Sequence, residues 1–206
     1  MTHNIFRKTT ALTFGLVTAT AIVAACGTDG TADPAPTSTQ QPILTGPEGT
    51  LKSPEQQATE AAIAKTSEFY AARGQIEADP TAPVEGLNRV AGNPVLDKYA
   101  ADITLRRSQG ITSTGQIQVL NAAVTDLDAP KDADGNPTAN PAWVHVEACT
   151  DISGWLNTYP DGRSAMDPDR GQFGVVKLTV RNPNWPDSDG WRVTSEEGKK
   201  VDSCNS

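Results

Sequence analysis

The sequence predicts an α+β fold, in which N-terminal helices pack on a curved antiparallel sheet. Two observations predict this class. Apolar residues recur at helical spacing between residues 53 and 110, and from residue 116 onward they alternate with polar residues as they do in strands. Helices that precede the strands, rather than alternate with them, are typical of α+β domains.

Three helices are expected in the first part of the domain. Ser53 and Gln56 form a capping box that begins the first helix, and Gly74 is its expected end. A short helix is expected over 83–91, and a third over 94–110, with arginines near its C-terminal end that suit the helix dipole. The apolar faces of the two longer helices are Ala58, Ala62, Ile63, Thr66, Phe69 and Tyr70, and Leu96, Tyr99, Ala100 and Ile103.

Four strands are expected after the helices, over 116–127, 142–150, 172–181 and 190–195. In the first strand the alternation slips by one residue, and this slip predicts a β-bulge. The two apolar sets that it separates are Ile117 and Val119, and then Leu120, Ala122 and Val124. Segments rich in Gly, Pro, Asn and Asp join the strands, as turn chemistry requires.

The N-terminus has the three parts of an export signal. Arg7 and Lys8 precede an apolar run over 11–23, which ends in small residues before Cys26. The run is interrupted by threonines and falls short of the roughly 20 residues that a membrane-spanning helix needs. We therefore expect residues 1–25 to be a signal peptide that is removed.

The last residues of this leader resemble a bacterial lipobox. Val23-Ala24-Ala25-Cys26 places one aliphatic and two small residues before a cysteine. The resemblance implies that the thiol of Cys26 receives a diacylglyceryl group and that the signal is cut just before it. The protein is then expected on the extracytoplasmic face of the cell membrane, and two acyl chains suffice for stable anchoring.

Residues 26–51 are expected to be the lipidated cysteine and a flexible tether, because they are rich in Thr, Pro, Gly and Ser. A single folded domain is expected over 52–206. Loss of the leader removes Arg7 and Lys8, which leaves 15 basic residues against 25 acidic ones, a charge of −10. This charge argues against nucleic acid and anionic lipid surfaces as partners.

The cysteine count favours a disulfide. If Cys26 carries lipid, then Cys149 and Cys204 remain as an even pair in an oxidising compartment. The alternative is two separate buried thiols, which export makes the weaker option.

A second resemblance concerns the domain itself. Four segments look like a group of lipoproteins from high-GC Gram-positive bacteria, whose domains are similar to the nuclear transport factor 2-like, or cystatin-like, cone fold. The segments are Val146-Glu147-Ala148-Cys149-Thr150-Asp151-Ile152-Ser153-Gly154-Trp155, Asp161-Gly162, Gly190-Trp191-Arg192-Val193 and Asp202-Ser203-Cys204. The resemblance covers roughly residues 52–204 and implies that fold and a disulfide. It implies little about function, because one fold hosts many activities.

His145 is the one histidine that remains after the leader is removed. It shares a strand face with Glu147, opposite the aliphatic face of the same strand. Because the aliphatic face is the better core face, we expect His145 and Glu147 to be exposed neighbours rather than an acid–base dyad. Trp143 and Cys149 share the strand face of His145 and Glu147, and Val144, Val146 and Ala148 lie on the opposite, aliphatic face.

An acidic segment hints at calcium, but its spacing does not fit an EF-hand. The segment contains Asp126, Asp128, Asp132, Asp134 and Asn136. Aligning its glycine to the EF-hand glycine puts Pro130 first and Pro141 last, where ligands are needed. We therefore expect a solvated hairpin loop and no metal. The sequence contains no phosphate-binding loop and no nucleophile motif, so no cofactor is predicted.

These observations predict a lipid-anchored protein whose domain binds a protein or a small ligand in the cell envelope without catalysis. A second hypothesis is a small cone-fold enzyme of the isomerase or cyclase kind, with an acid or base among Tyr70, Tyr99 and Asp102. The two tyrosines are expected in the core, with their hydroxyls at an edge. A third hypothesis is a phage- or prophage-encoded lipoprotein that blocks superinfection.

Overall fold

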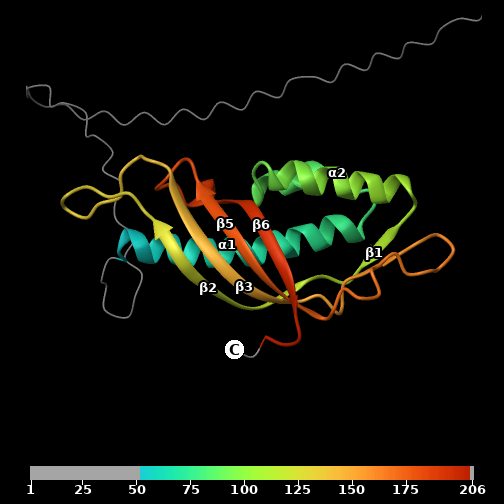
Figure 1. Ribbon diagram of the computed structural model, residues 1–206. Coiled ribbons are helices and arrows are strands. Elements are labelled where there is room, and N and C mark those ends of the chain that lie inside the picture. The colour runs from blue at the N-terminus through green and yellow to red at the C-terminus, as the bar shows by residue number, and fades with distance from the viewer. Residues whose placement is uncertain (1–51, 205–206) are drawn as a thin grey trace, which may run out of the picture. The chain divides into compact units, whose positions relative to one another are not determined.

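The computed structural model describes residues 52–204, which fold as an α+β domain (Figure 1), as the sequence predicts. The expected signal peptide 1–25, Cys26 and the tether 26–51 lie outside the described residues. No helix within 52–204 combines the length and apolar character that crossing a bilayer requires.

The three expected helices are present. They are α1 (Pro54–Ala78), the 3₁₀ helix η1 (Val84–Arg89) and α2 (Val95–Ser108). The capping box at the start of α1 is confirmed, because the side chains of Ser53 and Gln56 each accept a hydrogen bond from the other's backbone N–H.

The expected end of the first helix at Gly74 is wrong, because α1 continues for four more residues to Ala78. Gly74 has a different role. It is buried against the chain that enters the sheet, and a Cβ atom there would lie 2.9 Å from Cβ of Gln116. The glycine therefore permits a close approach between two segments and does not stop the helix.

The main sheet has four antiparallel strands in the order β2-β3-β5-β6. They are β2 (Gln118–Asp128), β3 (Ala142–Asp151), β5 (Phe173–Asn182) and β6 (Arg192–Val201). A separate two-stranded ribbon joins β1 (Thr112–Thr114) to β4 (Leu156–Thr158), and a single 3₁₀ turn, η2 (Ser188–Gly190), precedes β6. The sequence did not predict the ribbon, since three-residue strands leave no periodic pattern.

The register confirms the bulge in β2 and corrects the length of β6. The pairing of β2 with β3 shifts between Val119 and Asn121, as the sequence predicts, and shifts again between Val124 and Asp126. The last strand does not end at Ser195 but continues to Val201. Its second half is polar and reads as a loop in the sequence, but continuous pairing with β5 holds it in the sheet.

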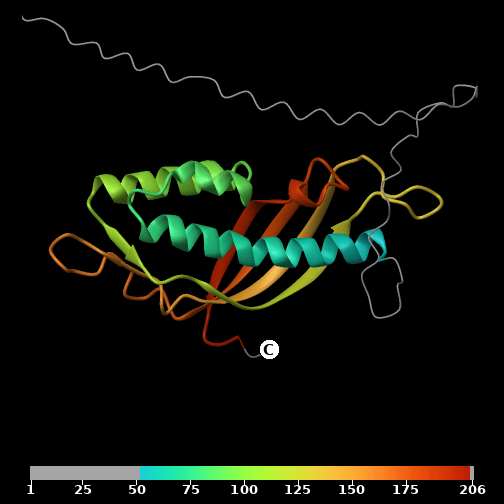
Figure 2. The same ribbon diagram turned by 180° about the vertical axis from the view of Figure 1, so that it is seen from behind.

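The helices cover one face of the sheet. Both views show α1 lying across the concave side of the curved strands, with α2 beside it (Figures 1 and 2). The aliphatic face of β3 is buried there, which confirms the strand parity. The core includes Phe69, Leu87 and Ile103 from the helices and Val144, Val146, Ala148, Leu178, Val180 and Val193 from the strands.

A disulfide joins Cys149 to Cys204, with 5.7 Å between their Cα atoms, as expected. Cys149 belongs to β3 and Cys204 follows β6, so the bond spans the intervening strand β5. It ties the end of an edge strand to the centre of the sheet. Its 55-residue separation corresponds to about 4 kcal/mol of stabilisation in the chain-entropy model.

Candidate functional site

A carboxylate from the edge strand lies between the two long helices. Glu196 of β6 accepts a hydrogen bond at 2.6 Å from the hydroxyl of Tyr70, on α1. Its other carboxylate oxygen accepts one from the hydroxyl of Tyr99, on α2. Both tyrosines are in the core with their hydroxyls at its polar edge, as the sequence predicts.

A buried arginine lies next to this group. The guanidinium of Arg73 lies 4.1 Å from the centre of the Tyr99 ring and 5.1 Å from that of Trp155, so it is held between two aromatic faces. Its Nε donates to Glu77 at 2.8 Å. Burial by itself would lower the pKa of Arg73, but Tyr99, Glu77 and Glu196 outweigh that effect and raise it.

The network continues toward the β1–β4 ribbon. Only 2 % of the Glu77 side chain is exposed, and its carboxylate accepts hydrogen bonds from Arg106 at 2.8 Å and from the indole of Trp155 at 2.7 Å. Arg106 also donates to Asn157, which binds Ser113 across the ribbon. Glu77 is therefore paired with two arginines, and removing either partner would leave a buried charge uncompensated.

The two tyrosines are strongly perturbed. Burial, and then the negative charge of Glu196, raise the pKa of Tyr70 well above its ordinary value. The pKa of Tyr99 is raised mainly by burial, and the nearby Arg73 opposes this rise only in part. Both hydroxyls therefore stay protonated near neutral pH and act as hydrogen-bond donors.

A pocket of about 200 Å³ opens beside the Tyr70–Glu196 pair. It lies on the helix-facing side of the sheet, at the end of the sheet formed by the last residues of β3 and β6 and the first residues of β5. Apolar walls with a few converging polar groups are typical of small-molecule sites. The residues that line it are Tyr70, Ile117, Thr150, Ile152, Arg170, Phe173, Gly174, Val176, Glu196, Gly198, Lys199 and Lys200.

Two glycines line this pocket. Gly174 of β5 pairs with Lys200, and Gly198 of β6 pairs with Val176, so both lie on the helix-facing side. A Cβ atom at Gly174 would be in ordinary contact, 3.4 Å from the Thr150 hydroxyl. A Cβ atom at Gly198 would lie 3.1 Å from Cγ1 of Val176, so this glycine accommodates the Val176 side chain, and Gly174 is the position that leaves room in the pocket.

The outer rim of the pocket is basic. Arg170 donates to the carbonyl of Trp155 at 2.6 Å, and Lys200 donates to the carbonyl of Asp169 at 2.9 Å. Within 52–204, neither of these two residues forms an ion pair with a carboxylate. The rim therefore carries uncompensated positive charge on a chain that is acidic as a whole.

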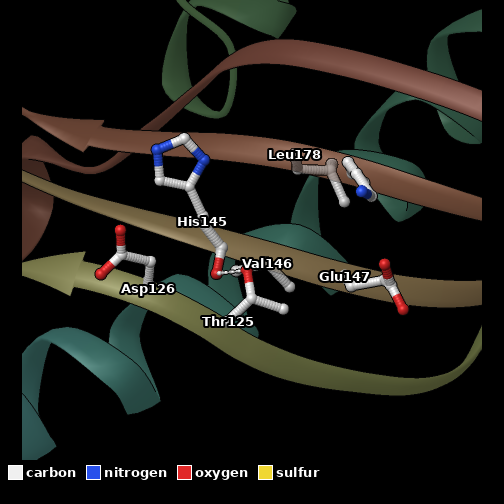
Figure 3. A pocket seen from close by; sticks show the side chains of 7 residues that line it. Thr125, Asp126, His145, Val146, Glu147 and Leu178 are labelled. Atoms are coloured by element: carbon white, nitrogen blue, oxygen red, sulfur yellow. Dashed lines mark hydrogen bonds between the residues drawn. The ribbon is translucent and has the colours of Figure 1, made fainter.

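His145 lies on the opposite, exposed face of the sheet, as its strand parity predicts. It borders a hollow of about 280 Å³ together with Asp126 and Glu147 (Figure 3). In the described part of the chain, no hydrogen bond joins the imidazole to either carboxylate. The imidazole of His145 packs edge-on against the Trp143 ring, and the two ring centres are 4.7 Å apart. The arrangement is that of exposed neighbours on an open surface.

The acidic segment forms a hairpin loop, as expected. The carboxylate of Asp132 accepts hydrogen bonds from the backbone of Asn136 and of Asp134, which lower its pKa. Among residues 52–204, no group of three acidic, histidine or cysteine side chains is placed to hold a metal ion. Asp102, a candidate acid, is exposed on α2 and bonds to Arg106.

Sequence reasoning missed Arg73, Glu77 and Glu196. The first two were detectable, because with Tyr70 they occupy positions i, i+3 and i+7 of the same helical stripe. Placing the end of the helix at Gly74 hid this pattern. The alternation of apolar and polar residues along β6 could not reveal Glu196. A register shift between β5 and β6, at Thr179, changes which residues of β6 face the helices after Val193.

Comparisons with known proteins give no family. No family model matches the sequence, and no curated protein matches it. Among solved structures, the intermembrane space region of the chloroplast protein ARC6 is 14% identical with a TM-score of 0.46, over 69% of this chain and 97% of that one. A de novo designed β-sheet protein is 19% identical with a TM-score of 0.25, over 71% and 98%. Similarity at this level carries no argument about family or function.

The raised pKa values of Tyr70 and Tyr99 predict an alkaline loss of stability. Unfolded tyrosine ionises with a pKa of about 10, whereas the folded protein keeps both hydroxyls protonated to higher pH. Above about pH 10 the unfolded state therefore releases protons first, and the free energy of unfolding falls by up to about 1.4 kcal/mol per pH unit for each tyrosine. Urea unfolding at several alkaline pH values measures this slope. The double variant Tyr70→Phe/Tyr99→Phe should show a shallower fall, and an unchanged slope would contradict the assignment.

Proposed function

We propose that this protein is a lipid-anchored lipoprotein on the extracytoplasmic face of the cell membrane, and that its folded domain binds a small ligand without catalysing a reaction. The lipobox-like sequence at Cys26, directly after an export signal, supports the anchor. The disulfide between Cys149 and Cys204 is in keeping with an oxidising compartment.

The observation that carries the binding proposal is the pocket beside Tyr70 and Glu196. It combines apolar walls with one partly buried hydrogen-bonding pair and a basic rim. Its volume of about 200 Å³ is below the roughly 300 Å³ at which drug-sized sites begin, so the ligand is small. The hollow around His145 is larger, but its polar side chains are exposed, whereas the hydroxyl-bearing Tyr70 of the smaller pocket is buried.

Binding is favoured over catalysis by the state of the buried groups. Glu196 already accepts hydrogen bonds from two tyrosines, and Glu77 is paired with two arginines. A carboxylate that acts as a general base must be within hydrogen-bond reach of a proton on the substrate, and the carboxylates of Glu196 and Glu77 already bind protein donors. The raised pKa values of Tyr70 and Tyr99 also remove both hydroxyls as bases near neutral pH.

A small enzyme is the second candidate, since Tyr70 and Glu196 converge at one pocket. In that case Glu196 would be the base, and the tyrosines would orient it. An enzyme would convert the bound molecule to a product, whereas a binding domain would release it unchanged.

The anchor is tested by replacing the acceptor cysteine. In cells fed a fatty-acid probe, the Cys26→Ala variant should lose the label and the processing that depends on lipid attachment. Cys149→Ala is the control, because it removes a cysteine outside the lipobox, and its label per molecule of protein should equal that of the wild type even though the disulfide is lost. Equal labelling of wild type and Cys26→Ala would contradict the anchor.

Ligand binding in the pocket is tested by looking for a small molecule that co-purifies with the protein. Protein purified in mild detergent from the cells that make it should release a small molecule on denaturation, detectable by mass spectrometry. Gly174→Val fills the pocket from a position where a Cβ atom meets only ordinary contacts, and it should release none. Gly154→Val is the control, because a Cβ there has open space around it. Release of no molecule by the wild type, or equal release by Gly174→Val, would contradict ligand binding in this pocket.

A further inference from the structure

The pocket has two polar ends of opposite character. One end holds Glu196 and Tyr70, and the other holds the basic rim of Arg170 and Lys200. Between them lie the two glycines and the apolar side chains. A ligand that satisfies both ends must itself carry two different groups.

The Glu196 end calls for a hydrogen-bond donor. A carboxylate has about four acceptor sites, and the two tyrosine hydroxyls occupy one on each oxygen of Glu196. Acceptor capacity therefore remains on a partly buried negative charge that borders the pocket. An ammonium group is the donor that gains most there, because a hydrogen bond between two charged groups is about twice as strong as a neutral one.

The basic end calls for an anion. Arg170 and Lys200 are held in place by backbone carbonyls, which orient them without neutralising them. Lys200 is additionally positioned by close packing, since a Cβ atom on the neighbouring Gly171 would lie 2.8 Å from its side chain. Positive groups that are fixed and carry no ion pair are suited to a carboxylate.

The distance between the two ends sets the length of the ligand. Glu196, Gly198 and Lys200 succeed one another on the helix-facing side of β6. At about 3.3 Å per residue, the Cα atoms of Glu196 and Lys200 are roughly 13 Å apart, and their side chains shorten the gap. An α-amino acid, whose two charges are adjacent, cannot contact both ends. A chain of several carbons between the charges can.

We propose that the pocket binds an ω-amino acid type of zwitterion: an amine that meets Glu196, an aliphatic body over Gly174 and Gly198, and a carboxylate that meets Lys200 and Arg170. This inference rests on the proposed function, since it names the ligand class of that pocket. It also accounts for Gly174, because an aliphatic chain needs the space that a side chain at this position would fill.

The test compares three probes that differ only in their charged ends: 6-aminohexanoate, hexanoate and hexylamine. They are titrated into the full-length protein in non-ionic detergent by calorimetry. The zwitterion should bind at least about tenfold more tightly than either singly charged probe. If hexanoate or hexylamine binds as tightly, or if no probe binds, the ligand class is overturned. Recovery of a molecule from the purified protein would still support ligand binding in the pocket.

Variants assign each end of the ligand. In Lys200→Met, 6-aminohexanoate should no longer bind more tightly than hexylamine. In Lys177→Met, whose substitution lies on the exposed face, the difference in affinity should be unchanged. Glu196→Gln should abolish the advantage over hexanoate, whereas Glu197→Gln, the exposed neighbour, should not. Lys200 is itself exposed, so its variant remains informative if Glu196→Gln fails to fold. Unchanged preferences in Lys200→Met would overturn the proposed orientation.

Discussion

The carboxylate of Glu196 is the point at which the three main parts of the domain meet. Tyr70 brings α1 to it, Tyr99 brings α2, and Glu196 itself belongs to the edge strand β6. A partly buried negative charge must be hydrogen-bonded or it costs several kcal/mol. The helices are therefore held at the sheet edge by a polar requirement as well as by apolar burial. Arg73, stacked on Tyr99 and bonded to Glu77, extends the same requirement along α1.

The pocket follows from this arrangement. Tyr70 holds α1 over the sheet at Glu196, and the pocket beside this pair extends over Gly174, which has no side chain to fill it. The wall formed by β6 is an edge strand, which pairs with β5 alone in the main sheet. The disulfide between Cys149 and Cys204 secures the chain just after this wall. Three features that are separate in the sequence thus maintain one cavity: the partly buried charge of Glu196, the missing side chain of Gly174 and the disulfide.

The sequence predicted the elements that follow simple periodicity and missed those that depend on tertiary pairing. The capping box at Ser53, the bulge near Leu120 and the inward face of β3 were all predictable, because each depends on local spacing. The second half of β6 was not, because its polar residues are held by pairing with β5. Gly74 was misinterpreted, since a glycine that ends a helix and one that permits close packing look alike in a sequence. The misinterpretation of Gly74 hid Arg73 and Glu77, and the unpredicted second half of β6 hid Glu196.

The central claim is that Glu196 joins the helices to the sheet through the tyrosine hydroxyls. A double-mutant cycle between Tyr70→Phe and Glu196→Gln measures this interaction most directly, from the urea unfolding of the wild type, the two single variants and the double variant. A hydrogen bond to a charged group predicts a coupling energy of about 1.5 to 3 kcal/mol. Single effects that add to within about 0.5 kcal/mol would contradict the claim, because uncoupled residues behave in that way.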